Sequence, residues 1–240
     1  MGKQIITNKD KLHFYSEKEY KFNFDKPLRE KPITYKILYP IARLLIQHIK
    51  FRDVEFYGTE NIPEKGGFIL ASNHVSGFDP ITLTYCMHGK RTMFFMAKEE
   101  FFHTFYTKIP LLILGGFPVK RGTSDRNSLN FAIRVLKEGY GLMIFPQGTR
   151  DKEHGRPEPE SAKAGIALIA REAKSDVLPV SIHRESSNSV KRAKLIIRFG
   201  EVIPYEELGF TEGETKSREL RTATKLIMER IGELWDKDRI

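Results

Sequence analysis

The sequence predicts an α/β fold in which helices flank a central, mostly mixed β-sheet. Three observations support this: short apolar runs follow Gly66-Gly67, segments of helical pattern separate them, and the two kinds of segment alternate along the chain. The predicted strands cover residues 68–72, 92–97, 117–120, 142–145, 177–182 and 195–199. The predicted helices cover residues 80–88, 99–106, 124–138, 162–173 and 216–235.

The region before the sheet has a different pattern. Residues 1–31 are polar and charged without a clear periodicity. In residues 32–51, Lys36, Arg43 and Lys50 recur along one stripe while aliphatic residues fill the rest, which predicts an amphipathic helix. Amphipathicity alone leaves two interpretations open: a helix packed on the core, or one lying on a membrane.

Charge and composition narrow the class of protein. Lys and Arg number 40 against 31 Asp and Glu, so the net charge of +9 favours anionic partners such as nucleic acid, anionic lipid or phosphorylated substrates. The single cysteine, Cys86, excludes an intramolecular disulfide and gives no support for a zinc cluster. The apolar runs are shorter than the roughly 18 to 20 residues of a spanning helix, and the first residues lack a secretory-signal pattern. We therefore expect no spanning segment and no export, with a membrane-associating helical element at residues 1–60 and an α/β domain at residues 61–240.

His74 and Asp79 are the first candidates for chemistry. His74 follows the predicted strand 68–72, and Asp79 precedes a proline where a helix should begin. The intervening loop contains Gly77 and is short enough to fold the carboxylate back onto the imidazole. Such a carboxylate fixes the imidazole tautomer and leaves the other nitrogen to take a proton from a nucleophile. The alternatives are a structural histidine and a helix-capping aspartate. Since no G-x-S-x-G signature is present, we expect the nucleophile to be a substrate hydroxyl.

Four sequence blocks carry a resemblance to a known family. NHVSGFDP at residues 73–80 resembles the H-x-x-x-x-D motif of the glycerolipid acyltransferases. GGFPVKR at 115–121, FPQGTR at 145–150 and VLPVSI at 177–182 resemble the second, third and fourth blocks in the family's order. Within that family the chain is most similar to the 1-acylglycerol-3-phosphate acyltransferases. The resemblance implies that the histidine of the first block is the general base and that the aspartate steadies it.

The resemblance also indicates which residues bind substrate. The Arg121 guanidinium can grip a phosphate with two hydrogen bonds, although a solvated charge is the alternative. Lys98, at another strand end, would add a point charge. Gln147 stands where the family usually has glutamate; it keeps a hydrogen-bonding oxygen and loses the charge, so we expect a positioning role. The residues implied to bind substrate are Lys98, Arg121, Gln147, Gly148, Thr149 and Arg150.

An apolar stretch at residues 109–116 follows several aromatic residues. These aromatic residues are Phe101, Phe102, Phe105 and Tyr106. Two interpretations stay open at this point, packing into the core and lining of an acyl-chain cavity.

The implied reaction transfers a fatty acyl group from an acyl thioester, on coenzyme A or acyl carrier protein, to the sn-2 hydroxyl of 1-acylglycerol 3-phosphate. The product would be phosphatidate, in phospholipid biosynthesis. Glycerol 3-phosphate or another lysophospholipid is the alternative acceptor. A non-catalytic protein that binds anionic lipid surfaces is an alternative of another class, but it leaves the four ordered blocks unexplained. A nucleic-acid-binding protein is disfavoured because no nucleic-acid motif is found.

The expected partners follow from that reaction. They are the lysophospholipid acceptor, the acyl thioester donor, with acyl carrier protein as one of its two candidate carriers, and an anionic membrane surface. No metal and no bound cofactor are implied. We expect the protein to lie on the cytoplasmic face of the cell membrane, as a peripheral or monotopic protein.

Overall fold

The computed structural model describes residues 21–29, 51–87, 91–122, 125–151, 155–185 and 193–238. Its centre is a seven-stranded sheet with the strand order β1-β7-β6-β2-β5-β3-β4. The strands are β1 Phe51–Tyr57, β2 Phe68–Ser72, β3 Met93–Lys98, β4 Gly116–Val119, β5 Gly141–Ile144, β6 Asp176–Glu185 and β7 Ala193–Phe199. All neighbouring strands run parallel except β6 and β7, which are antiparallel, so the predicted mixed sheet is confirmed.

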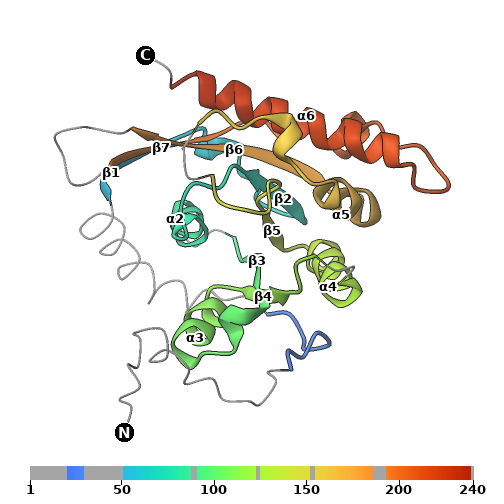
Figure 1. The fold of residues 1–240 in the computed structure, drawn as a ribbon. Helices are drawn as coiled ribbons and strands as arrows, with labels where there is room; N and C mark the ends of the chain where they lie inside the picture. The colour runs from blue at the N-terminus through green and yellow to red at the C-terminus, as the bar shows by residue number, and fades with distance from the viewer. Residues whose placement is uncertain are drawn as a thin grey trace, which may run out of the picture.

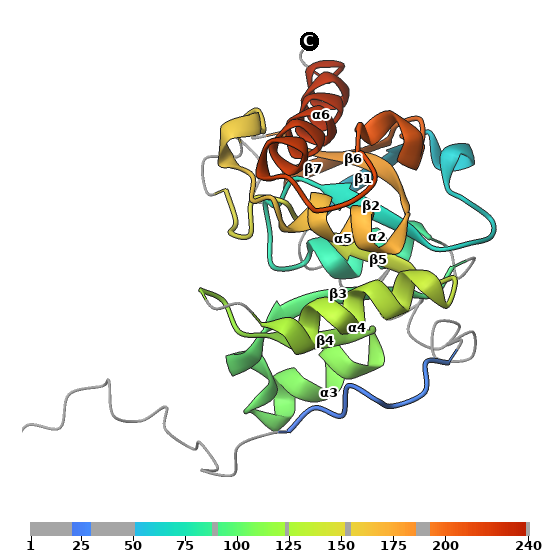
Figure 2. The same cartoon turned by 90° about the vertical axis from the view of Figure 1, so that its right-hand side faces the viewer.

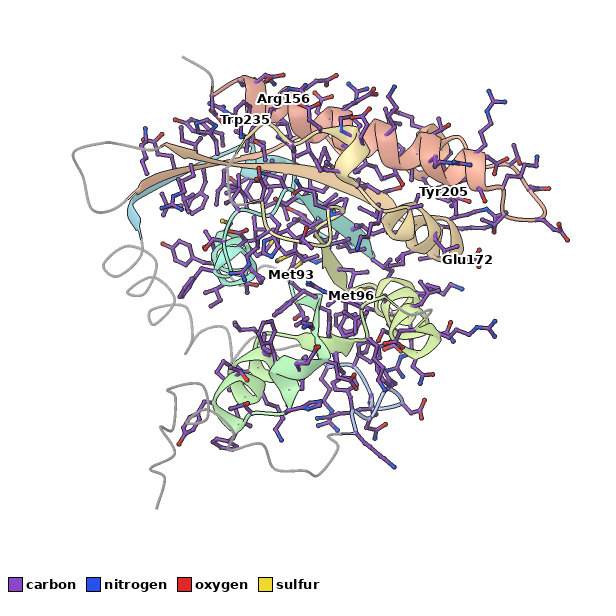
Figure 3. All side chains as sticks on the ribbon, viewed as in Figure 1. Met93, Met96, Arg156, Glu172, Tyr205 and Trp235 are labelled. Carbon is purple, nitrogen blue, oxygen red and sulfur yellow. The ribbon has the colours of Figure 1, made fainter. Side chains whose placement is uncertain are left out.

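Helices cover both faces of this sheet (Figures 1 and 2). On one face lie α2, Asp79–Cys86, and α3, Phe105–Ile113. On the other lie α4, Arg126–Lys137, α5, Gly165–Ala173, and α6, Ser217–Asp236. Because strand side chains alternate between faces, Met93 and Met96 of β3 belong to the two different apolar clusters (Figure 3).

The C-terminal helix α6 forms where the sequence predicts a helix and buries one of its faces. Ala223, Ile227 and Ile231 recur at four-residue spacing and are fully buried against the sheet. Near the end of the helix, Arg156 Nε donates to Asp236 Oδ2 at 3.0 Å, which ties the 155–158 segment to α6 beside Trp235 (Figure 3). Within the part of the chain that the structure describes, no helix is long and apolar enough to cross a membrane.

Two features of the N-terminal half differ from the sequence predictions. Strand β1, which was not predicted, falls within residues 1–60 and pairs with β7, so this part of the proposed membrane element belongs to the sheet. Its inward residues Val54 and Phe56 pack on the core, since a period of two suits an edge strand with one buried face. The helix predicted for residues 32–51 lies outside the described residues up to residue 50, and Phe51 already begins β1.

The second difference concerns the predicted helix at residues 99–106. The structure has a short 3-10 helix, Glu99–Phe102, and then α3, with the extended backbone of Thr104 (φ −104°, ψ 129°) between them. That extended residue ends one helical segment and starts the next. Most of α3 therefore lies in the apolar stretch at residues 109–116.

Residues 21–29 pack against the α/β domain rather than standing apart. The ring centroids of Phe22 and Phe24 lie 5.5 and 5.8 Å from that of Phe131 on α4. Arg134 Nη2 donates to the carbonyl oxygens of Phe24 and Lys26, each at 2.8 Å. This short segment is therefore held by both apolar and polar contacts.

Candidate active site

The loop after β2 brings His74 and Asp79 together. His74 Nδ1 lies 2.7 Å from Asp79 Oδ2, and the aspartate side chain is 1% exposed while the histidine is partly exposed. With the carboxylate ionised, Nδ1 carries the proton in this contact, which leaves Nε2 as the nitrogen that can accept a proton. The structure therefore contains the contact that the five-residue spacing predicts.

The Asp79 carboxylate also closes the loop that holds it. The same Oδ2 accepts hydrogen bonds from the backbone N–H groups of Val75 and Ser76, both at 2.8 Å. Helix α2 begins at Asp79 itself, with Pro80 in its first turn, and its N-cap residue Phe78 makes no side-chain capping bond. The carboxylate thus turns back to His74 and the loop, and the alternative interpretation of Asp79 as an N-cap is wrong.

The loop after β5 is interlocked with the His74 loop. Gln147 Oε1 accepts a hydrogen bond from the backbone N–H of His74 at 3.0 Å, and the N–H of Asp151 donates to the His74 carbonyl at 2.7 Å. The ring of Phe145 stacks on the imidazole with a centroid distance of 4.2 Å and an interplanar angle of 22°. The neighbouring loop therefore fixes both the backbone and the ring plane of His74.

These contacts clarify the role of Gln147. Its amide oxygen accepts the bond from the His74 N–H, as a carboxylate oxygen at the same position could, and this contact agrees with the positioning role expected for Gln147. The N–H of Gly148 is used within the turn, where it donates to the Phe145 carbonyl at 2.9 Å. This N–H group is therefore occupied within the protein and does not point to a substrate.

Asn73 was not singled out from the sequence and yet anchors the same loop. Its buried side chain accepts from the N–H of Ile182 at 2.7 Å and donates to the carbonyl of Ile182 at 2.9 Å. The pair of bonds ties the end of β2 to β6. Its position beside His74 in the first block was the available signal.

Two cations lie close to the interlocked loops. A methyl group added at Gly77 would lie 3.5 Å from Nη1 of Arg150, so the guanidinium lies over the turn between His74 and Asp79. A methyl group added at Gly148 would lie 3.3 Å from Nζ of Lys163. Lys163 was missed in the sequence because it falls just before α5, outside the matched blocks. In the third block, Thr149 and Arg150 are both exposed.

Lys98 and Arg121 lie farther along the same edge of the sheet. Strand β4 is three positions from β2 in the sheet, which corresponds to about 14 Å at roughly 4.8 Å per strand. Lys98 Nζ lies 2.8 Å from Glu100 Oε1, and the hydrogen bond from Lys98 lowers the pKa of Glu100. Arg121 is exposed and forms no ion pair with the residues that the structure describes.

The strand ends explain why these groups converge. Strands β2, β5, β3 and β4 are parallel neighbours, so the loops that follow them all leave the sheet at the carboxyl ends of these strands. We refer to this end of the sheet as the His74 edge. This edge combines a carboxylate-oriented imidazole with several cations, a set that suits proton removal from a hydroxyl attached to an anionic substrate. Ligand binding at the carboxyl ends of parallel strands is the rule in such sheets.

Comparison with known proteins agrees with these features. The family model described as Acyltransferase matches residues 53–183. The 1-acyl-sn-glycerol-3-phosphate acyltransferase of Bacillus subtilis is 32% identical over 191 residues, covering 77% of this chain and 89% of that protein. The protein of the same name from Streptococcus pneumoniae is 26% identical over 190 residues, covering 78% and 69%.

A solved structure shares the fold. The crystal structure of the 1-acyl-sn-glycerophosphate (LPA) acyltransferase, PlsC, from Thermotoga maritima has a TM-score of 0.59 to this chain at 24% identity, covering 82% of this chain and 78% of that one. The family match spans the strands and loops that bring His74, Asp79 and the third block together. The chain belongs to the acyltransferase family and is an enzyme of that family.

Proposed function

We propose that the protein transfers a fatty acyl group from an acyl thioester to the sn-2 hydroxyl of 1-acylglycerol 3-phosphate and so forms phosphatidate. The names of the similar proteins support this acceptor. The observation that carries the proposal is the 2.7 Å contact between His74 Nδ1 and the buried Asp79 carboxylate. It leaves Nε2 to act as a general base toward a substrate hydroxyl.

In the proposed reaction His74 Nε2 takes the proton of the sn-2 hydroxyl as the oxygen attacks the thioester carbonyl carbon. A new C–O bond forms, the tetrahedral intermediate collapses and the C–S bond breaks. The imidazolium, stabilised by Asp79, then returns the proton to the departing thiolate. No enzyme nucleophile is needed, because the acceptor hydroxyl supplies it.

The acceptor phosphate needs a cation near this base. Only a few covalent bonds separate the sn-2 hydroxyl from the phosphate, and the Arg150 guanidinium lies over the His74–Asp79 turn. Arg121, at the end of β4, and Lys98 extend the positive surface along the same edge, although a phosphate at Lys98 would compete with Glu100. In this proposal Arg150 and Arg121 grip the phosphate and Lys98 contributes charge.

Product identification tests the function. Purified protein is offered radiolabelled acyl-coenzyme A or acyl carrier protein together with 1-acylglycerol 3-phosphate, glycerol 3-phosphate or 1-acylglycerophosphocholine. We expect label at the sn-2 position of phosphatidate, and His74→Ala should lower the rate by about 10² to 10⁴ without loss of the fold. If only glycerol 3-phosphate becomes labelled, the acceptor is glycerol 3-phosphate, the alternative considered above. A folded His74→Ala variant with normal turnover would overturn the mechanism.

A further inference from the structure

The first part of α3 carries exposed apolar side chains. Phe105 is 66% and Tyr106 85% exposed, and Ile109 and Phe101 are exposed beside them. Every residue of α3 remains at least partly exposed, whereas Leu111 and Leu112 hold the helix to the core. Phe102 is in the core, as one of the two interpretations from the sequence had it. Phe101, Phe105 and Tyr106 lie outside the core of the part of the chain that the structure describes.

The charges around this surface have one predominant sign. Lys108 is half-buried in α3 between the exposed residues Tyr106 and Ile109, and Lys120 and Arg121 follow β4, on which α3 packs. The nearby carboxylates Glu99 and Glu100 are paired with Lys120 and Lys98, at 3.7 and 2.8 Å. Aromatic residues interleaved with cations are typical of a surface that meets anionic lipid headgroups.

The position of the helix relates this surface to the site. Lys98 ends β3, and the chain passes from it directly into the 3-10 helix Glu99–Phe102 and α3. Strand β3 is parallel to β5 and β2, so the chain leaves β3 at the sheet edge that carries His74. In both views α3 lies at the end of the molecule opposite α6 (Figures 1 and 2).

We propose that the surface formed by Phe101 of the 3-10 helix and by Phe105, Tyr106 and Ile109 of α3, with the half-buried Lys108 among them, is a docking surface for an anionic lipid bilayer. The aromatic and aliphatic side chains enter the headgroup region and the surrounding cations contact the headgroups. This inference rests on the proposed function, because an enzyme whose acceptor is a bilayer lipid must bind the bilayer. Docking here presents the His74 edge of the sheet to that lipid.

A tryptophan pair tests the surface directly. Trp235 is the single native tryptophan and is buried, so it supplies a constant background. Tyr106→Trp is compared with Tyr57→Trp, which replaces another exposed tyrosine. Tyr57 lies on β1, the outermost strand on the side of the sheet away from β4. With phosphatidylglycerol vesicles whose acyl chains are brominated, we expect a blue shift and quenching for Tyr106→Trp, and little of either for Tyr57→Trp.

Sedimentation gives the second measurement. We expect Phe105→Ser/Tyr106→Ser/Ile109→Ser to lower partitioning onto phosphatidylglycerol vesicles by about tenfold or more, because three apolar side chains no longer insert. Tyr57→Ser is the matched control and should sediment as the parent does. Lys108→Gln should reduce the preference for phosphatidylglycerol over phosphatidylcholine vesicles.

The outcomes separate this proposal from the proposed function. The docking surface is overturned if the parent protein does not sediment with the vesicles. It is also overturned if the Tyr106→Trp protein sediments but its emission is not quenched. Either result counts even when acyl transfer to detergent-dispersed acceptor is normal. Emission from position 106 that is blue-shifted before vesicles are added would mean that another part of this chain, or a second copy, covers α3, which also overturns it. Conversely, if Tyr106→Trp emission is quenched by the vesicles but the protein does not acylate 1-acylglycerol 3-phosphate, the docking surface is supported and the proposed function is overturned.

Discussion

The loops after β2 and β5 and the loops after β3 and β4 leave the sheet at the same end of its parallel strands. Both pairs contain a carboxylate that closes a loop, Asp79 in the first and Asp125 in the second, but they differ in the side chains that they present. In the first pair, hydrogen bonds from His74, Val75 and Ser76 close one loop and link it to the other. In the second pair, cations are exposed and α3 keeps its aromatic residues in solvent. In our proposals the central pair holds the reacting groups, which need fixed positions, whereas the outer pair contacts the lipid surface.

The strongest test of this contrast is Asp79→Asn. The change removes the charge that stabilises the imidazolium and favours the wrong tautomer, for which losses of about 10⁴ in rate are known in triads. Here it also weakens the acceptor of two loop N–H groups. We expect kcat to collapse while circular dichroism stays native. A variant that loses thermal stability but keeps its turnover would give Asp79 a purely structural role.

Gln147 tests whether the second loop positions the base. Gln147→Ala leaves the His74 N–H without its acceptor, at a cost of about 1 to 3 kcal/mol, which is roughly 5- to 150-fold if it is expressed in kcat. Gln147→Glu keeps the acceptor oxygen and should stay within a few-fold of the parent. Steady-state kinetics decides: a fall in kcat with nearly constant KM values, rescued by glutamate, supports positioning. Equal activity of both variants would contradict it.

The cations distinguish the inner from the outer loops. Arg150→Lys and Arg121→Lys each keep the charge but lose the two-pronged hydrogen bonding of the guanidinium, so acceptor KM should rise by roughly tenfold. We expect the larger change for Arg150, since it lies over the His74 turn, and little change in donor KM for either. The measurement is repeated with a phosphate-free monoacylglycerol. If this acceptor suffers the same loss, the arginines are structural.

The smallest effect is expected from the segment before β1. Leu38→Ser/Ile41→Ser/Leu45→Ser should reduce vesicle binding and activity on bilayer-embedded acceptor a few-fold, with less effect on detergent-dispersed acceptor. Substitution is preferable to truncation, because Phe22 and Phe24 pack on Phe131 and would be lost with the segment. If this variant sediments fully with anionic vesicles, these residues do not bind the membrane, and the alternative interpretation of core packing is supported.

The sequence by itself determined the features that depend on short range. Alternating apolar runs predicted six of the strands, and the five-residue spacing with Gly77 predicted that Asp79 could reach His74. The four blocks also indicated the family, which the comparisons confirm. These predictions succeed because strand burial, turn formation and a contact within one short loop are local consequences of the residues involved.

The tertiary structure decided what depends on the order of strands in the sheet. Gln147 reaches His74 across 73 residues of sequence, and Asn73 reaches Ile182 across 109, only because β5 and β6 lie on either side of β2. Likewise, β1 becomes a strand because the edge of β7 offers it hydrogen bonds. The exposure of Phe105 and Tyr106 is of the same kind, since an apolar run shows hydrophobicity but not which of its faces another element covers.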